Sequence, residues 1–307
     1  MDKNKALNAE EVAAKLSIAK NTVYELIKRG ELKSYKVGRK VRIDQVDLEE
    51  YIIKSKNSIT LNNELIINDK TVPQSFIISG QDRLLDILGN ILENHKDGVK
   101  TLRSYTCSFP GLINLYYDKC QITSVHLWDW ESDEYNIDYV KKLVPGVPCI
   151  LINIAKRTQG FFVKKGNPKN IKSWLCLERD DVKIINREKG SGTRVLLDGK
   201  IKSNFMSPSK IDGYYDEKTN HIAVANHVAN GYADVGLGSE AAYNGIQGID
   251  FIPMKTESYD IVIKKENFNN PIYKLVYDII CSDAYKNSIN NFIGYYYTDL
   301  GRIVGET

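Results

Sequence analysis

Two short segments near the start of the chain carry apolar residues at helical spacing. Asn8, with Glu11 three positions later, is typical of a helix start, and Gly30 is typical of a helix end. Residues 8–16 and residues 20–29 each present one apolar face, formed by Val12, Ala13 and Leu16 in the first and by Val23, Leu26 and Ile27 in the second. The pattern predicts two helices joined by a tight turn, which is the plan of a helix-turn-helix unit.

The segment that follows has the pattern of a small hairpin and a further helix. Residues 32–36 and 41–43 are predicted strands on either side of Gly38-Arg39, and Asp44 is suited to cap a third helix. The apolar set of that helix is Val46, Leu48, Tyr51 and Ile52. Helix, helix, hairpin and helix together predict a winged helix-turn-helix domain over residues 1–55.

The distribution of charge in this domain indicates the kind of partner that it binds. Residues 20–42 hold eight lysines or arginines and two glutamates, a net charge of +6, whereas the whole chain carries only +3. A local basic face on a nearly neutral chain is typical of phosphate binding, although a solvated surface or a protein-binding helical module can have the same composition. The residues expected to contact DNA are Lys20, Asn21, Thr22, Tyr24, Lys28, Arg39, Lys40 and Arg42.

Residues 7–13, 22–32 and 36–43 resemble the excisionase and MerR-like winged helix-turn-helix domains. One departure is Val41, where that family often has an aromatic residue. The resemblance implies that double-stranded DNA is a partner. Because helix-turn-helix proteins normally bind two half-sites as dimers, it also implies a homodimer.

The rest of the chain has a different pattern. Residues 56–74 are polar and indicate a linker. From residue 75 onward, apolar runs of strand type alternate with segments of helical spacing, which predicts an α/β architecture for residues 75–307. A helical region is expected from about 271 to 293. The predicted strands are 75–78, 102–106, 122–127, 149–154, 159–163, 182–185, 233–238, 251–254 and 259–263.

A Gly-Ser-Gly-Thr-Arg sequence at residues 190–194 follows one of these strands and opens a helix. Backbone N–H groups, the hydroxyls of Ser191 and Thr193 and the guanidinium of Arg194 would meet there and attract a small anion. The spacing is not that of a P-loop. The alternative is an ordinary strand-to-helix turn that uses glycine for its backbone conformation.

Ser79 and Ser108 stand at two further places where a strand ends and a helix begins. In open α/β sheets, ligands collect in the crevice outside the carboxyl ends of the strands. Three helix starts with hydroxyl groups facing one crevice would hold a compact oxyanion largely by neutral dipoles.

This long segment resembles the type II periplasmic-binding-protein-like domains that follow helix-turn-helix domains in bacterial regulators and are related to molybdate- and tungstate-binding proteins. The resemblance implies two lobes joined by crossing strands near 150–154 and 251–254. Lobe 1 would then comprise about 75–152 and 253–307, and lobe 2 about 153–252. The matching stretches are residues 79–82, 126–129, 134–136, 167–169, 186–187, 190–194 and 233–238.

The resemblance also implies a set of ligand contacts in the crevice. Molybdate or tungstate is the first ligand hypothesis, although the threonine-rich first loop of the tungstate binders is replaced here by Ser-Gly-Gln-Asp at 79–82. A small organic ligand is the alternative. The expected contacts are Ser79, Gly80, Ser108, Ser191, Gly192, Thr193 and Arg194, with His126, Asp129, Tyr215 and His221 as further candidates.

Several of these residues also have simpler interpretations. His126 and Asp129 could form a buried pair that has no ligand role. Trp128 and Trp130 are more simply packing residues, and the tyrosines at 295–297 are expected to cover core surface.

Other classes of protein fit the sequence less well. The five cysteines are scattered without a Cys-x-x-Cys pair and the four histidines lack ligand spacing, so we predict no metal site and no cofactor. No apolar run is long enough to span a bilayer and the N-terminus is polar, which favours the cytoplasm. Two-lobed folds also serve enzymes such as porphobilinogen deaminase, but the spacing shows no nucleophile–base pair. The prediction is therefore a DNA-binding transcriptional regulator, not an enzyme, that senses a small oxyanion.

Overall fold

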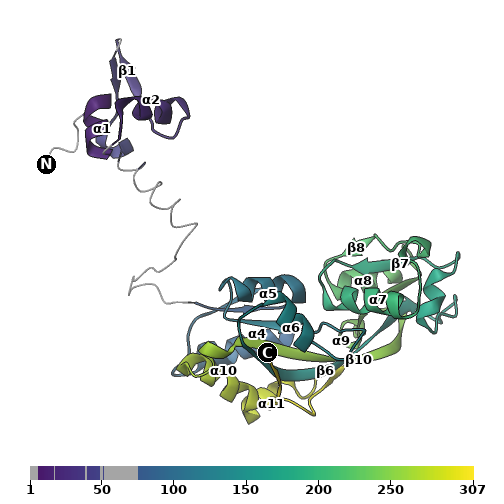
Figure 1. Ribbon diagram of the computed structural model, residues 1–307. Helices are drawn as coiled ribbons and strands as arrows, with labels where there is room; N and C mark the ends of the chain where they lie inside the picture. Colours follow the sequence, from purple (N-terminus) through teal and green to yellow (C-terminus); the bar gives the residue numbers. More distant parts are fainter. Residues whose placement is uncertain (1–5, 17, 39, 49–50, 52–74) are drawn as a thin grey trace. The chain divides into compact units, whose positions relative to one another are not determined.

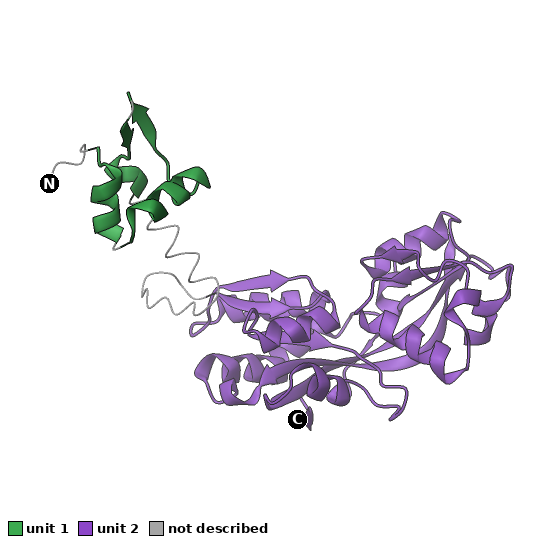
Figure 2. Cartoon of the chain, turned by 45° about the horizontal axis from the view of Figure 1, so that its top comes forward, with its two compact units in different colours: residues 1–72 green, residues 73–307 purple. Residues whose placement is uncertain are grey.

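The computed structural model describes residues 6–16, 18–38, 40–48, 51 and 75–307. The chain divides into two compact units, Met1–Val72 and Pro73–Thr307 (Figure 2). Arg39, Ile52 and the predicted linker at 56–74 lie outside the described residues. No helix in the described part of the chain is long and apolar enough to cross a membrane.

The first unit contains helices α1 (Ala9–Leu16) and α2 (Lys20–Lys28) and the hairpin strands β1 (Tyr35–Val37) and β2 (Lys40–Arg42), with further helical residues at 45–48 and 51. Asn8 caps α1 as predicted: its side-chain oxygen accepts from the N–H of Glu11 at 2.9 Å, and the Glu11 carboxylate accepts from the N–H of Asn8 at 2.8 Å. The reciprocal pair satisfies two of the backbone donors that a helix start leaves unpaired. The core of the unit includes Val12, Val23, Leu26, Leu32 and Ile43.

One boundary in the first unit differs from the prediction. The hairpin begins at Tyr35, three residues later than expected, and pairs antiparallel with Tyr35 opposite Arg42. Leu32 is instead buried in the helical core, and its N–H donates to the carbonyl of Leu26 at 3.3 Å. The turn that ends α2 therefore takes the residues predicted to start the strand.

The second unit has two lobes built around a shared sheet with the strand order β4-β3-β5-β10-β6-β9-β7-β8 (Figure 1). Strands β6 (Cys149–Lys164) and β10 (Ile249–Lys264) are each 16 residues long and pair antiparallel from end to end. The two shorter strands predicted within each of these segments are wrong, because each segment is one continuous strand. Polar residues such as Arg157 and Glu257 interrupt the apolar pattern of the sequence, but they lie within the paired strands, directly opposite each other.

Lobe 1 places three parallel strands beside one end of β10, namely β3 (Phe76–Ser79), β4 (Thr101–Ser104) and β5 (Ile122–Val125). Strands β11 (Tyr295–Tyr296) and β12 (Ile303–Glu306) pair with β6. The helical region predicted at 271–293 is broken at Ser282, whose side chain caps the second of two helices by accepting from the N–H of Tyr285. The helices of the lobe are α4 (Arg83–Asn94), α5 (Ser108–Tyr116), α6 (Ile137–Leu143), η3 (Lys265–Asn267), α10 (Pro271–Cys281) and α11 (Asp283–Ile289).

Lobe 2 lies at the other end of the two long strands. Strand β9 (Val235–Ser239) pairs antiparallel with β6 and parallel with β7 (Ile184–Arg187), which in turn pairs with β8 (Glu217–Lys218). The helices of the lobe are η1 (Trp174–Glu178), α7 (Gly192–Ser203), η2 (Pro208–Lys210), α8 (His221–Ala229) and α9 (Glu240–Tyr243). Each lobe has its own apolar core, so β6 and β10 form the shared backbone connection between them.

Candidate ligand-binding cavity

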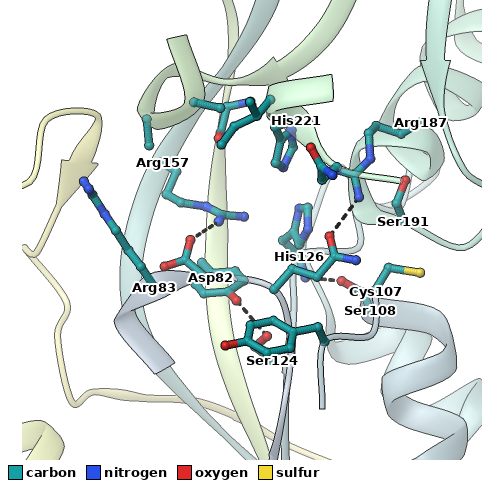
Figure 3. A pocket seen from close by; sticks show the side chains of 18 of the residues that line it. Asp82, Arg83, Cys107, Ser108, Ser124, His126, Arg157, Arg187, Ser191 and His221 are labelled. Atoms are coloured by element: carbon teal, nitrogen blue, oxygen red, sulfur yellow. Dashed lines mark hydrogen bonds and ion pairs between the residues drawn. The ribbon is translucent and has the colours of Figure 1, made fainter. Parts of the chain in front are cut away.

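A cavity of about 560 Å³ lies where the two lobes face each other (Figure 3). Four of the predicted contacts, Ser108, Ser191, His126 and His221, line it. Lobe 1 also contributes Gln81, Asp82, Arg83, Tyr105, Thr106, Cys107, Ser124, Tyr259 and Tyr295. Arg157 of β6 and the lobe 2 residues Arg187, Thr219, Asn220, Ile222, Ser239, Ala241 and Ala242 complete the lining.

Four helices of eight residues or more begin at this cavity, and three of them have no carboxylate at the start. These three are α5 at Ser108, α7 with Ser191 as its N-cap and α8 with Asn220 as its N-cap. The start of an α-helix carries unpaired N–H groups and a partial positive charge. Lobe 1 and lobe 2 therefore both turn a positive helix end toward the same space, as the sequence predicted for α5 and α7.

Ser191 caps α7, and its hydroxyl group is already used in two hydrogen bonds within the turn. Its hydroxyl accepts from the N–H of Arg194 at 3.2 Å and donates to the carbonyl of Glu188 at 2.9 Å. The side chain therefore shapes the turn, which is the ordinary interpretation considered for the Gly-Ser-Gly sequence. The same turn places Ser191 on the cavity wall, and anion binding there stays a prediction.

The start of α4 differs from the other helix starts. Asp82 is its N-cap and accepts from the N–H of Leu84 at 2.8 Å. A carboxylate at this position already satisfies the helix dipole, so α4 offers an incoming anion little attraction. Ser79 and Gly80 are not among the residues that line the cavity, unlike the prediction: Ser79 is fully buried and its hydroxyl lies 2.5 Å from that of Thr106.

A network of buried charged groups forms part of the cavity floor. The Arg157 guanidinium donates to Asp82 at 2.6 Å and to Glu257 at 2.7 Å, and Nδ1 of His126 lies 2.8 Å from the other Glu257 oxygen. The side chains of Asp82 and Arg157 are 5% exposed and that of Glu257 is 1% exposed. The Arg157 guanidinium also lies 3.9 Å from the centre of the Tyr259 ring. This arrangement joins lobe 1 to the long strands at the floor of the cavity.

These contacts shift the pKa of the groups involved. Burial alone would raise the pKa of Glu257, but the charge of Arg157 and the hydrogen bond with His126 lower it to about 2. Burial likewise opposes the charged form of Arg157, yet Glu257 and Asp82 raise the pKa of Arg157 further above its ordinary value. Both groups are therefore charged at neutral pH, and their pairing explains why the buried network is tolerated.

The lowered pKa of Glu257 leads to a pH-dependent stability. When folding lowers the pKa of a carboxyl group, its ionised form stabilises the folded state at any pH above the unfolded-state pKa. This stabilisation is lost as the pH falls from the unfolded-state pKa through the folded-state pKa. We expect the melting temperature to fall between pH 4.5 and about 2, and the difference between wild type and Glu257→Gln to shrink over this interval. Calorimetric melting at several pH values measures both. A difference that stays constant with pH would contradict the assignment.

His221 has a defined hydrogen-bonding state. Burial, followed by the charges of Arg187 and Arg157, lowers its pKa well below the ordinary value, so the ring is neutral. Its Nδ1 accepts from the N–H of Ser239 at 3.4 Å, which leaves the ring proton on Nε2. His221 therefore offers a neutral donor at the start of α8.

Arg187 is a functional candidate that the sequence analysis missed. Its guanidinium is held by both oxygens of Glu188, at 2.8 and 2.9 Å, and reaches across the cavity to the Gln81 side chain at 3.0 Å (Figure 3). The side chain is 2% exposed. A signal was present, because Arg187 is the last residue of a strand that leads into the Gly-Ser-Gly turn. The N–H of Phe109 also crosses to the carbonyl of Gly190 at 3.0 Å, so the lobes touch on this side of the cavity.

Gly192, Thr193 and Arg194, which the sequence predicted as ligand contacts, do not line the cavity. The Arg194 guanidinium pairs with Asp198 and Glu217, both at 2.8 Å, and its charge is therefore already satisfied inside lobe 2. Thr193 donates to Gln159 at 3.3 Å. Gly192 packs against His126 so closely that an added Cβ would lie 2.4 Å from the His126 carbonyl oxygen.

Asp129 and Tyr215 are also placed away from the cavity. Asp129 accepts from the N–H groups of Glu131 and Ser132 and lies 3.4 Å from Lys142, so it closes a turn. The proposed pair with His126 is wrong, because the partner of His126 is Glu257. Tyr215 is 73% exposed and contacts the neighbouring Tyr214 ring.

Two of the aromatic residues have the packing role that the sequence predicted, and one of them also lines the cavity. Trp128 is buried in the core of lobe 2, as expected for a packing residue. Tyr295 packs on the core of lobe 1, but its hydroxyl also donates to Asp82 at 2.9 Å and it lines the cavity.

The structure offers little for nucleophilic or metal chemistry at this site. Burial, with a contribution from Glu188, raises the pKa of the Cys107 thiol to about 11, so it is protonated at neutral pH. Ser108 accepts from the backbone N–H of His126 at 3.3 Å. Among the residues that the structure describes, no group of three His, Cys, Asp or Glu side chains is arranged to hold a metal ion.

In the first unit, α2 presents the side chains predicted to contact DNA. Lys20, Asn21, Thr22, Tyr24 and Lys28 are exposed along the helix, while Val23 and Leu26 are buried beneath them. Lys20 also pairs with Glu10 of α1. On the hairpin, Lys40 is exposed and Arg42 is half-buried.

Fold and cavity together define a two-lobed ligand-binding domain joined to a helix-turn-helix domain. The model of the PBP superfamily domain matches residues 89–280, and that of a helix-turn-helix domain matches residues 6–55. The chain belongs to the PBP superfamily. The predicted α/β fold with an N-terminal helix-turn-helix domain is confirmed, and the combination is that of a DNA-binding regulator with a PBP-like ligand-binding domain.

One similar protein matches the whole chain and another matches about a third of it. It is 41% identical over 317 residues to the uncharacterized protein YvgK of Bacillus subtilis (strain 168), with all of both chains covered. It is 43% identical over 112 residues to an uncharacterized Clostridium pasteurianum protein encoded in the 5′ region of a 2Fe-2S ferredoxin gene, a match to 36% of this chain and 99% of the relative.

Solved structures support the fold. An H2O2-bound mutant of Corynebacterium glutamicum OxyR matches with a TM-score of 0.52 and 11% identity, over 92% of this chain and 89% of its own. An ABC-type phosphate transport receptor from Vibrio cholerae matches with a TM-score of 0.50 and 16% identity, over 72% of this chain and 99% of its own. An ancestral arginine-binding protein bound to arginine matches with a TM-score of 0.50 and 17% identity, over 72% and 98%.

Proposed function

We propose that the protein is a cytoplasmic, homodimeric transcriptional regulator whose PBP-like domain binds a small anion and thereby changes the affinity of the helix-turn-helix domain for double-stranded DNA. The observation that carries the ligand class is the cavity wall. Three helix starts without a carboxylate cap surround one space to which both lobes contribute. The buried guanidinium groups of Arg157 and Arg187 also line this space, the first paired with Asp82 and Glu257 and the second with Glu188. Helix starts and guanidinium groups are the donors that proteins use for oxyanions and carboxylates.

An oxyanion of the molybdate or tungstate type is the first candidate within this class. Hydroxyl groups from Thr106, Ser108, Ser124, Thr219 and Ser239 join the helix starts around the cavity. Such neutral donors stabilise a compact anion without requiring a matching number of cations.

A small organic anion is the second candidate, and the size of the cavity favours it. Four oxygens at roughly 30 Å³ each, the share of a water molecule in the liquid, occupy far less than the cavity volume of about 560 Å³. Cavities of roughly 300–1,000 Å³ hold organic ligands. The contacts of Gln81 with Arg187 and of Phe109 with Gly190 already join the lobes, which limits further shrinkage.

Isothermal titration calorimetry of the full-length protein separates the two candidates. The panel is molybdate, tungstate, sulfate, phosphate and a set of mono- and dicarboxylates. Binding of molybdate or tungstate alone supports the first candidate, and binding of a carboxylate alone supports the second. Absence of heat from every anion in the panel overturns the anion hypothesis.

An enzymatic role finds less support in the geometry. The Cys107 thiol is protonated at neutral pH, and Ser108 contacts the backbone of His126, not its imidazole. A nucleophile needs an adjacent base or a lowered pKa. We therefore propose a regulator that is not a catalyst.

The DNA-binding half is tested by removing two exposed lysines, Lys28 on α2 and Lys40 on β2. Each lysine that contacts a phosphate adds about one unit to the slope of log affinity against log salt concentration. We expect Lys28→Ala with Lys40→Ala to weaken binding of operator and unrelated fragments alike and to reduce that slope by roughly two units. Fluorescence anisotropy at several salt concentrations measures it.

The matched control for this experiment is Lys286→Ala on α11 in the second unit. Unchanged DNA binding by this control is expected. An unchanged salt slope in the double variant would show that the face of α2 and the hairpin is not the DNA surface.

A further inference from the structure

The loop of residues 128–135, between β5 and α6, belongs to lobe 1 by its position in the chain, yet it packs on lobe 2. We refer to this loop as the strap. Trp128 is 3% exposed and lies in the lobe 2 core with Phe161 and Leu196, and Trp130 and Tyr135 pack against the same core. The strap is therefore a further contact between the lobes, in addition to β6, β10 and the hydrogen bonds beside the cavity.

The base of the strap is fixed to the two long strands. Asn136 accepts from the N–H of Leu127 at 2.6 Å, and its own N–H donates to the Leu127 carbonyl at 2.8 Å, which closes the loop. The Asn136 side chain also donates to Asp260 of β10 at 2.6 Å, and Asn153 of β6 donates to the same carboxylate at 2.8 Å. Asn136 has a φ of 71° and a ψ of −48°, the conformation of a tight γ-turn, which the hydrogen bond from the N–H of Ile137 to the Tyr135 carbonyl closes at 2.9 Å. The base therefore cannot shift without disturbing this buried network.

The rest of the strap packs against the side of α7 and contacts the neighbouring part of β10. A Cβ added to Gly199 would lie 3.0 Å from the Trp128 ring, closer than an ordinary contact, so a side chain at this position would push the ring away from the helix. The Lys200 ammonium lies 4.1 Å from the centre of the Trp128 ring, and Lys202 lies 4.4 Å from that of Trp130. Attraction of this kind between a cation and an aromatic face stabilises the contact.

One carboxylate joins the strap to β10. Asp133 accepts from the Trp128 ring N–H and from Lys255, both at 2.8 Å. The hydrogen bond from Lys255, followed by that from Trp128, lowers the pKa of Asp133, so the carboxylate is charged at neutral pH. Aromatic packing and the ion pair between Asp133 and Lys255 together stabilise the contact of the strap with lobe 2 and β10.

Helix α7 connects the strap to the cavity. Its start, at Ser191, forms part of the cavity wall, and the strap holds the helix further along, at Gly199 and Lys200. Val195, between these points, packs on the lobe 1 core. A helix of 12 residues is a rod of about 18 Å, so a shift at its flank also moves its start.

We propose that the strap positions α7 against lobe 1 and so holds the cavity in the arrangement seen here. Loosening the strap separates the start of α7 from the start of α5 and weakens ligand binding, although no residue of the cavity wall has changed. This inference concerns the contact between the lobes and holds whether or not the ligand is an anion.

The test uses the full-length protein and Gly199→Val, which forces a side chain against Trp128. Hydrogen–deuterium exchange without ligand is measured for peptides that cover the starts of α5 and α7. Exchange at both is expected to rise roughly tenfold, since an overpacked contact opens locally. Trp128→Leu combined with Gly199→Val removes the clash and is expected to restore part of the protection at both helix starts.

The matched control is Gly89→Val on α4, where an added Cβ would meet Thr101 at 3.2 Å, a comparable crowding far from the strap. Equal exchange at the two helix starts in Gly199→Val and Gly89→Val would overturn the proposal, since it would show only general destabilisation. Unchanged exchange at the start of α7 in Gly199→Val would do the same.

A fluorescence measurement reports on the strap itself. The chain has three tryptophans, so Trp174→Phe leaves Trp128 and Trp130 as its emitters. In this background Gly199→Val is expected to shift the emission to longer wavelength as Trp128 leaves the core. Unshifted emission together with unchanged exchange would refute the strap mechanism.

Binding of sodium molybdate by calorimetry links the strap to the cavity. If wild type binds molybdate, Gly199→Val is expected to bind roughly tenfold more weakly and Gly89→Val as well as wild type. Equal loss in both variants would contradict the proposal. If wild type does not bind molybdate, molybdate is excluded as the ligand of the proposed function, while exchange and fluorescence still decide the role of the strap.

Discussion

Arg157→Met is expected to destabilise the PBP-like domain by about 3–5 kcal/mol, because it leaves two buried carboxylates without their partner. Asp82 and Glu257 lie 2.6 and 2.7 Å from the Arg157 guanidinium and are almost completely buried. For a domain of this size, the loss corresponds to a melting temperature lower by on the order of 10 °C. Differential scanning calorimetry at pH 7 measures it.

Two further variants separate a charge effect from a packing effect. Arg179→Met removes an exposed ion pair with Asp181 and is expected to leave the melting temperature unchanged. Adding Glu257→Gln to Arg157→Met removes one of the unpaired charges and is expected to recover part of the lost stability. If the double variant is less stable than the single variant, the penalty does not come from the unpaired carboxylate.

Arg187→Ala is expected to weaken anion binding by on the order of 100-fold, because a buried guanidinium that faces a ligand anion supplies charge-assisted hydrogen bonds. Glu188 and the Thr219 carbonyl hold the side chain in place, so its remaining donor capacity is oriented before any ligand arrives. Calorimetric titration with whichever anion of the panel binds to wild type measures the loss.

Arg83→Ala is the matched control, since Arg83 also lines the cavity but is exposed and directed away from its centre (Figure 3). Its guanidinium lies 3.7 Å from the centre of the Phe292 ring. We expect less than roughly a threefold change in affinity, as for an exposed charge. The anion affinity of Arg187→Lys is expected to lie between that of wild type and that of Arg187→Ala. Lysine keeps the positive charge but lacks the planar set of N–H donors of a guanidinium group. Equal losses in Arg83→Ala and Arg187→Ala would exclude a specific role for Arg187.

Some elements could be predicted because their determinants lie close together in the chain. The capping pair of Asn8 and Glu11 spans a single helical turn, and the apolar face of α2 repeats within nine residues. The Gly-Ser-Gly turn also gave a correct local prediction, since Ser191 does begin α7 at the cavity wall.

The errors came from residues whose partners are distant in sequence. Arg194 has the charge of an anion-binding residue, but it pairs with Asp198 one helical turn later and with Glu217, which is 23 positions later. Arg157 and Glu257 are 100 positions apart and meet only because β6 and β10 pair along their whole length. A single sequence contains no signal for such a pairing, because strand register depends on the whole sheet.

The sequence by itself determined the helix-turn-helix pattern, the alternation of strands and helices and the helix starts that carry serines, because these follow from short-range periodicity and capping. The tertiary structure alone decided which charged groups face the cavity and which are paired away from it. It also decided that Trp128 crosses to lobe 2. The physical reason is that the burial and pairing of a charged or aromatic group depend on neighbours that only the folded chain brings together.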